Sequence, residues 1–377
     1  MESYPHTNQA DWRPESSVAV EHSGRTYLLT VLVLAAALVI SVAVGAVTIP
    51  VREILALLVP ASLRGMLSPN LIIPASDRTI VLEIRLPRTV LIALVGAGLA
   101  GSGAAYQGLF RNPLADPYLL GVASGAGLGA ILAMSWEGPG GVPVFARLGP
   151  SLGLYFVPAV AFAGALLTVL LVYRLGRTRQ DRTGVPDSHL SYLILAGVAI
   201  GALATALTSF LILRFEGDMQ RAIVWMLGGY ALGGWQPVWA LLPYILIGLV
   251  GLSLLGRPLN VLQFGEEQAL QLGLDVPRAR LAIVVLASLT TAAAVSFAGI
   301  IGFVGLAVPH LVRMMIGSDY RRLVPMSILS GAILLLLADV LARTAEAPQE
   351  IPVGIVTALL GVPFFLYLLR TSSRLSM

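Results

Sequence analysis

Apolar stretches, each near the length of a membrane-spanning helix, alternate along this chain with shorter polar segments. A helix needs about 20 mostly apolar residues to cross the hydrocarbon core of a bilayer. The pattern therefore predicts an all-α integral membrane protein with about ten transmembrane helices. Their expected cores are Tyr27–Val47, Thr89–Leu109, Tyr118–Trp136, Leu152–Tyr173, Leu190–Leu213, Trp235–Leu255, Leu281–Phe297, Ile300–Ile316, Leu323–Ala342 and Val353–Leu369, with a short re-entrant or surface helix at Ile223–Leu232.

The chain begins with a polar tail, residues 1–26, which lacks the basic start and short apolar core of a signal peptide. The membrane domain is expected over residues 27–371. An even number of spans places both termini on one side of the membrane. Arginine is concentrated on that side, above all between Arg174 and Arg182, and this distribution predicts that both termini are cytoplasmic.

Composition excludes several classes of function. The chain is 57% hydrophobic and 12% charged, whereas soluble domains carry about 25% charged residues. It has no cysteine, so disulfides, thiolate metal sites and cysteine catalysis are excluded. All 24 basic residues are arginine, and a Walker A phosphate loop requires lysine. If ATP drives this protein, a partner must therefore hydrolyse it.

The charge balance and the histidines point to no further ligand. The net charge of +4 fits membrane topology better than nucleic-acid binding, so the bilayer is the expected surrounding and no nucleic-acid partner is expected. The four histidines are scattered, and His310 has no second histidine or carboxylate at ligand spacing. We expect no bound metal or other cofactor, and a hydrogen-bonding role for His310 at a helix end.

A polar segment, Gly256–Arg280, separates two of the apolar stretches. Within it, Glu266–Leu272 is a helix-forming run, and Gly273 stands where it could cap that helix. The predicted topology places this segment in the cytoplasm. A short capped helix between membrane spans is typical of a surface that another protein binds.

Two proline-containing segments are expected to interrupt helices at membrane depth: Arg111–Pro117, which includes Asn112 and Pro113, and Gly305–His310, which includes Pro309. Irregular backbone is tolerated there only where protein or a water-filled cavity covers it. Such interruptions in both halves of the chain fit an internal repeat around a transport pathway.

Glycines recur at helical spacing inside the apolar stretches. Residues 96–101 match the pattern G-x-G-x-x-G, but no strand precedes them, so a dinucleotide site is not indicated. Gly121, Gly125 and Gly129 recur every four residues. Small residues on one face let helices approach closely in lipid, which predicts a tightly packed bundle.

Four charged residues are candidates for function or structure. Asp339 and Arg343 are four residues apart, so they share a helix face and are expected to form a structural ion pair near the outer edge. Pairing offsets the cost of a charge in the membrane, about 3 kcal/mol. Arg85 and Arg88 are either interfacial anchors or a positive pair for carboxylates of an external protein.

Thr205, Thr208 and Ser209 lie close together on the fifth predicted span. Their hydroxyl groups either donate back to helix carbonyls or line a small polar gate in a pathway. The sequence alone leaves both interpretations open.

Several motifs follow one another in a characteristic order between Arg85 and Leu369. They are Leu86–Thr89 leading into GAGLAGSGAAYQ, Arg111–Gly121, Trp225–Gly229, Gly299–Arg313 and Glu350–Pro363. Together these motifs resemble the FecCD-type permeases, the membrane subunits of ATP-binding-cassette (ABC) importers for iron–siderophores, haem and cobalamin.

The resemblance implies the type II ABC importer fold, with ten helices per subunit and a homodimeric pore. It also implies two cytoplasmic ATPase subunits, which use ATP and Mg²⁺, and an external substrate-binding protein, so that the permease itself is not an enzyme. The segment 256–280 would contain the coupling helix that meets the ATPase. There Glu267, Ala269 and Gly273 match the pattern E-A-A-x-x-x-G, with Gln268 replacing one alanine.

The resemblance further implies that Arg85, Arg88 and Arg343 meet glutamates of the binding protein. The expected function is import of an iron–siderophore across the bacterial cytoplasmic membrane, with cobalamin or haem as alternatives. The rival class is an ion-coupled secondary transporter, which needs an intramembrane carboxylate poised for protonation. Asp339 is the best candidate for that carboxylate, and Arg343 stands beside it.

Overall fold

The computed structural model describes residues 16–45, 49–58, 74–136, 150–183, 188–214, 219–229 and 233–372, and in these segments every regular element is helical. In chain order the elements are α1 (Ser16–Ala43), α2 (Val51–Leu58), α4 (Ala75–Thr79), the π-helix η1 (Ile80–Arg85), α5 (Leu86–Leu109), α6 (Val122–Ser135), α7 (Pro150–Thr183), α8 (Ser188–Leu213), α9 (Met219–Met226), α10 (Gln236–Leu254), α11 (Gly256–Leu262), α12 (Glu266–Gln271), α13 (Val276–Ala298), α14 (Val304–Ile316), α15 (Tyr320–Thr344) and α16 (Val353–Ser372).

The helices coincide in position with the predicted span cores, whereas the number of about ten transmembrane helices stays a prediction. Each predicted core falls on one helix of its own, namely α1, α5, α6, α7, α8, α10, α13, α14, α15 or α16. Among the described residues, six of these helices are long and apolar enough to cross a membrane: α1, α7, α8, α10, α13 and α15. Helices α6, α14 and α16 are apolar but shorter. The chain is therefore a multi-pass membrane protein.

Some boundaries differ from the prediction. Helix α1 begins at Ser16, inside the segment 1–26 that the sequence predicted to be a polar tail, although its apolar window begins only at Gly24. Helix α9 stands close to the predicted short helix at Ile223–Leu232. The sequence did not predict α2, α4, η1 or α11, because each is short and carries little of the span-length signal.

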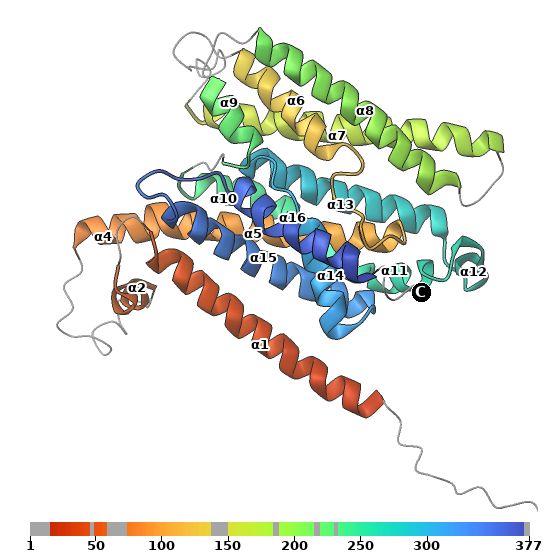
Figure 1. Cartoon of the computed structure of the whole chain (residues 1–377), viewed down its shortest axis with the longest axis horizontal. Coiled ribbons are helices and arrows are strands. Elements are labelled where there is room, and N and C mark those ends of the chain that lie inside the picture. Colours follow the sequence, from red (N-terminus) through yellow and green to blue (C-terminus); the bar gives the residue numbers. More distant parts are fainter. Residues whose placement is uncertain are drawn as a thin grey trace, which may run out of the picture.

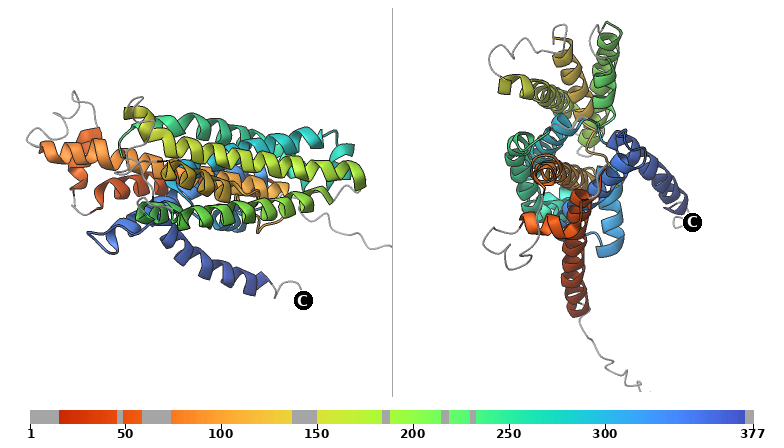
Figure 2. Two further views of the ribbon diagram at one scale, coloured as in Figure 1. Left: turned by 90° about the horizontal axis from the view of Figure 1, so that it is seen from above. Right: turned by 90° about the vertical axis from the view of Figure 1, so that its left-hand side faces the viewer.

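Helix α5 is the centre of the bundle (Figure 1). It packs most extensively against α15 and also contacts α13, α14 and α10. Helices α6, α7 and α8 form a second group on one side, and α1 lies against α15 on the other (Figures 1 and 2). Helices α2 and α4 stand at one end of the bundle, and α11 and α12 at the opposite end.

Glycines allow α5 to meet its neighbours backbone to backbone. A Cβ atom at Gly96 would run into the carbonyl of Gly331 in α15, and one at Gly103 would run into the carbonyl of Gly305 in α14. Such contacts bring Cα–H groups against carbonyl oxygens and maximise van der Waals packing where lipid offers no hydrophobic driving force. The packing interpretation of the G-x-G-x-x-G segment is confirmed.

The predicted glycine face of α6 is also confirmed. Gly125 lies against the carbonyl of Gly164 in α7, and Gly129 lies against that of Val160. Gly121 differs from these two, because it has φ of 76° and begins α6 in the left-handed region that favours glycine. These contacts fix the second group of helices as closely as the first.

The predicted interruption at Gly305–His310 is wrong, whereas that at Arg111–Pro117 is confirmed. Helix α14 continues through Pro309, whose missing N–H leaves the Gly305 carbonyl free of its helical partner, and that carbonyl faces Gly103 instead. The irregular backbone lies just earlier, at residues 299–303, where the Tyr118 hydroxyl bonds both the N–H and the carbonyl of Ile301. Protein groups thus satisfy the exposed backbone, as the membrane requires.

We predict that Gly103→Ala lowers the stability of the protein. The new methyl group must displace the backbone of α14, and overpacking of this kind destabilises by about 1–3 kcal/mol. The measurement is the thermal unfolding midpoint in detergent. Gly127→Ala is the matched control, because its nearest non-local atom would be Ile300 Cδ1 at 3.8 Å. Equal midpoints for the two variants would contradict the close approach of α5 and α14.

Candidate functional site

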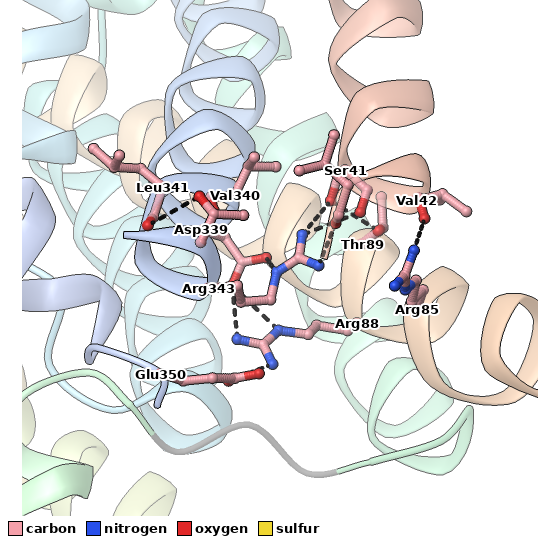
Figure 3. A network of polar contacts seen from close by, with 12 residues as sticks. Ser41, Val42, Arg85, Arg88, Thr89, Asp339, Val340, Leu341, Arg343 and Glu350 are labelled. Atoms are coloured by element: carbon pink, nitrogen blue, oxygen red, sulfur yellow. Dashed lines mark hydrogen bonds and ion pairs between the residues drawn. The ribbon is translucent and has the colours of Figure 1, made fainter. Parts of the chain in front are cut away.

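A buried carboxylate organises the charged residues at the end of the bundle that carries α2 and α4 (Figure 3). Asp339 of α15 is 0% exposed. Its Oδ2 accepts a hydrogen bond from Arg343 Nε at 2.9 Å, and its Oδ1 accepts from Arg88 Nη2 at 3.0 Å and Nε at 3.2 Å. The predicted pair of Asp339 and Arg343 is confirmed. The bridge from Arg88 additionally joins the first turn of α5 to the last turns of α15.

Arg88 also reaches a second carboxylate. Its Nη1 donates to Glu350 Oε2 at 2.8 Å, and Glu350 lies on the loop between α15 and α16. The side chains of Arg88 and Glu350 are 23% and 53% exposed, so this bridge lies at the protein surface. A cavity of about 40 Å³ borders Arg88, Asp339 and Glu350.

The other two arginines face inward, toward the C-terminal end of α1. Arg85 Nη1 donates to the carbonyls of Val42 and Ala43 at 2.9 and 3.0 Å. Arg343 donates to the carbonyls of Val44 and Ser41 at 3.0 and 3.1 Å. The last carbonyls of a helix lack intrahelical partners and carry partial negative charge, so guanidinium groups stabilise them. The cluster therefore ties α1, α5 and α15 together.

The structure brings the three predicted docking arginines into one cluster, but it exposes them unequally. Arg85 and Arg343 are each 7% exposed, and Arg88 is the most accessible of the three. Contact with an external protein stays a prediction for all of them. Sequence reasoning missed the bridges from Arg88 to Asp339 and Glu350, because each joins residues more than 250 positions apart.

The predicted helix in the polar segment Gly256–Arg280 is confirmed as α12, and Gly273 closes it. The Leu274 N–H donates to the Ala269 carbonyl at 3.0 Å, and the Gly273 N–H donates to the Leu270 carbonyl at 2.9 Å. This pair of bonds is the Schellman motif, which needs a left-handed residue, and Gly273 has φ of 82°. No atom of the described chain lies near the Cβ position of Gly273, so its surroundings are open.

Two contacts fasten α12 to the bundle. Ala269 is fully buried in the hydrophobic core, and Glu266 forms an ion pair with Arg280 of α13, both largely buried. The opposite face of α12 is open. Glu267 is exposed there, as are the large apolar side chains of Phe264, Leu270 and Leu272. A rigidly anchored helix with apolar side chains in the open is typical of a protein-binding surface.

Helix α11 connects the base of α12 with the two central helices. Asn260 donates to Asp319 Oδ1 at 2.6 Å and accepts from the Tyr320 N–H at 2.8 Å, at the start of α15. Gln263 donates to the carbonyl of Gly108 at 2.9 Å, at the end of α5.

The Asp319 carboxylate in this connection is held in its ionised form. Burial raises the pKa of Asp319, but hydrogen bonds from Asn260 and the Arg321 N–H, together with nearby guanidinium charges, outweigh burial and lower it below its usual value. The connection from α11 to α15 therefore persists across the physiological pH range.

The three hydroxyl residues of α8 donate back to their own helix. Thr205, Thr208 and Ser209 each bond the carbonyl four residues earlier, at 2.9, 2.8 and 3.0 Å. Thr205 and Ser209 face outward from this single chain, and Thr208 is buried. The back-bonding interpretation is confirmed. Lining of a pathway stays a prediction, because it needs a partner on the exposed face of α8.

The remaining predicted site residues have structural positions. Asn112 accepts the Leu114 N–H at 2.9 Å and shapes the turn around Pro113. Pro309 is buried in α14, and His310 follows it half-buried. The prediction that His310 lies at a helix end is wrong, because α14 continues past it to Ile316, and no hydrogen-bond partner for its Nδ1 is found among the described residues. Among those residues, no three histidine or acidic side chains gather as a candidate metal site.

A bundle of long apolar helices, with an anchored helix at one end and a charged cluster at the other, defines a multi-pass membrane protein. A family model for the FecCD transport family matches residues 32–371. The chain therefore belongs to the FecCD transport family, and it is an ABC importer permease of that family. The predicted resemblance is confirmed.

Individual relatives show the range of the family. The chain is 46% identical to the cobalamin import system permease protein BtuC of Halobacterium salinarum, over 79% of this chain and 75% of the relative. It is 42% identical to the hemin transport system permease protein HmuU of Yersinia pestis, over 76% and 82%. It is 39% identical to the uncharacterized ABC transporter permease protein YvrB of Bacillus subtilis, over 92% and 94%.

A solved structure agrees with the fold. It is described as a metal-chelate type ABC transporter in an inward-facing conformation. It matches with a TM-score of 0.75 at 29% identity, covering 92% of this chain and 99% of that chain.

We predict that Asp339→Asn strongly destabilises the protein. The substitution leaves Arg88 and Arg343 without their shared buried counter-charge, and breaking a buried ion pair costs about 3–5 kcal/mol. The thermal unfolding midpoint in detergent reports the effect. Glu350→Gln is the control, because loss of an exposed ion pair costs at most about 1 kcal/mol. If Asp339→Asn shifted the midpoint no more than Glu350→Gln, the cluster would not depend on Asp339.

Proposed function

We propose that this chain is the pore-forming subunit of an ATP-driven importer that moves a bulky metal chelate across the bacterial cytoplasmic membrane. A ferric siderophore, cobalamin or haem fits this class. The names of the relatives, which cite cobalamin and hemin, and the metal-chelate description of the solved structure support a ligand of this kind. Two copies form the pore, each with about ten transmembrane helices, and both termini lie in the cytoplasm.

The anchored helix α12 is the observation that carries the proposal. Its exposed residues Glu267, Leu270 and Leu272 form the surface on which a cytoplasmic ATPase subunit docks. Ala269 and the ion pair from Glu266 to Arg280 transmit its displacement into α13. One ATPase subunit under each copy of the permease hydrolyses ATP with Mg²⁺, and this chain binds neither.

The charged cluster at the opposite end of the bundle is the docking site for the external substrate-binding protein. Arg88 is its accessible cation, with Arg85 and Arg343 behind it. Electrostatic contacts of this kind guide docking and fix its register more than they add affinity. Specificity for the ligand then resides in the binding protein. The exposed hydroxyl residues Thr205 and Ser209 of α8 meet the pathway where the two copies face each other.

The environment of Asp339 disfavours the rival ion-coupled mechanism. A proton- or ion-binding carboxylate must change its charge during transport. Asp339 instead bonds two guanidinium groups and is fully buried, so removal of its charge would leave Arg88 with only the exposed Glu350 and take from Arg343 the carboxylate that it bonds. This arrangement suits a permanent structural anion.

Uptake by the reconstituted complex tests the proposal. The permease is purified with its associated ATPase and substrate-binding subunits, the ligand in the binding protein is identified, and uptake is measured in proteoliposomes. We expect uptake that requires ATP and persists when proton and sodium gradients are dissipated. Uptake by the permease alone, driven by an ion gradient, would contradict the proposal.

We predict that Gly273→Val uncouples ATP hydrolysis from uptake. A β-branched residue in the left-handed region costs about 1–2 kcal/mol. This cost lowers the population of the capped conformation at the end of α12 by roughly tenfold. The measured quantity is ligand taken up per ATP hydrolysed. Gly273→Asn is the matched control, because asparagine tolerates this conformation, and it should retain coupling. An unchanged ratio in Gly273→Val would remove the role of this cap.

A further inference from the structure

Arg88 is unusual in holding two carboxylates of different accessibility. Its bond to Asp339 is an interior contact between α5 and α15, whereas its bond to Glu350 lies at the surface (Figure 3). Glu350 is 53% exposed and uses one oxygen, Oε2, on one guanidinium nitrogen, Nη1. Exposed ion pairs of this geometry are weak, because water and salt compete with both partners.

The charges of the cluster do not balance without Glu350. Two arginines, Arg88 and Arg343, bond the buried anion Asp339, and Glu350 supplies a second negative charge, on Arg88. With Glu350 turned away, these two guanidinium groups would share one carboxylate, an excess of one positive charge. Such a cluster attracts an acidic group from outside.

A cavity that could hold such a group lies beside Arg88. The cavity bordered by Arg88, Asp339 and Glu350 has a volume of about 40 Å³. Because a cavity needs only about 10–15 Å³ of such volume to hold one water molecule, this cavity has room for the two oxygens of one carboxylate. Gly228 and Gly229, which follow α9, form part of its wall together with Val224 of α9.

We propose that Glu350 is an internal competitor of the binding protein: it holds Arg88 in the undocked permease, and docking replaces it there with a carboxylate of the partner. The proposal rests on the docking face assigned above. It adds a residue to that face, and it fixes the chemistry of the contact as an exchange of one carboxylate for another on the same guanidinium. The exchange leaves the buried bond from Arg88 to Asp339 unchanged.

The exchange also connects docking with α16. Glu350 precedes α16, which begins at Val353, and the Ile351 N–H donates to the Ala342 carbonyl at 3.0 Å. Gly354, in the first turn of α16, lies against the carbonyls of Leu227 and Ile300. Release of Glu350 therefore removes a side-chain tether at the start of a helix whose N-terminal turn contacts the segments after α9 and α13.

Docking affinity tests the competition. The permease–ATPase complex is placed in nanodiscs, and the probe is the substrate-binding protein that purifies with it, titrated at low salt. We expect Glu350→Gln to tighten docking by about two- to fivefold, the factor that an exposed ion pair supplies. In the background of Arg88→Gln, the same substitution should have no effect.

Glu346→Gln is the matched control for general charge. Glu346 lies exposed on the same loop and forms no ion pair with the described residues. Equal tightening by Glu346→Gln and Glu350→Gln, unchanged or weaker docking of Glu350→Gln, or tightening that persists without Arg88 would each overturn the competition. If the wild-type complex docked no binding protein at this face, the proposed function itself would be wrong, so the two failures are distinguishable.

A spin label on the loop gives an independent readout. The chain has no native cysteine, so Gln349→Cys introduces a unique labelling site next to Glu350. We expect label mobility to rise when the binding protein docks on the wild-type complex, and to be high already in Glu350→Gln. A label whose mobility is the same in the wild type before and after docking would contradict the exchange.

Discussion

The close approach of helix backbones is the constraint on which the rest of this structure depends. In lipid, helices gain little from burying apolar surface against each other, so association relies on van der Waals contact and on the few polar groups available. Contacts such as Gly96 with Gly331 and Gly103 with Gly305 bring α5 against α15 and α14 with no side chain between them. The central helices are consequently packed together as one body.

Polar side-chain contacts then join the central helices at the two ends of that body. At one end, Asp339 joins α5 to α15 through Arg88 and Arg343. At the other, Asn260 of α11 and Gln263, which follows α11, hold the start of α15 and the end of α5. Helices α5 and α15 therefore connect the end that carries α12 with the charged cluster. In the proposed importer, this connection would let an ATPase subunit at α12 and a binding protein at the cluster sense one another.

Local rules predicted what depends on near neighbours in the sequence. The span cores follow from apolar length, α12 and its Gly273 cap from helix propensity and left-handed geometry, and the pair of Asp339 and Arg343 from helical spacing. Contacts between distant segments could not be predicted in this way. The capping of α1 by Arg85 and the bridge from Arg88 to Glu350 depend on how the helices associate. The continuity of α14 through Pro309 could not be predicted either, because the freed Gly305 carbonyl faces Gly103 of another helix.

The side of the membrane on which α12 lies tests the central claim most directly. A single cysteine at Leu272, which is 65% exposed, is treated with a membrane-impermeant maleimide in intact cells and in inside-out vesicles. The account predicts labelling in the vesicles only, and protection when the ATPase subunits are bound. Labelling in intact cells would place the helix outside and contradict the claim that this permease is driven from the cytoplasm.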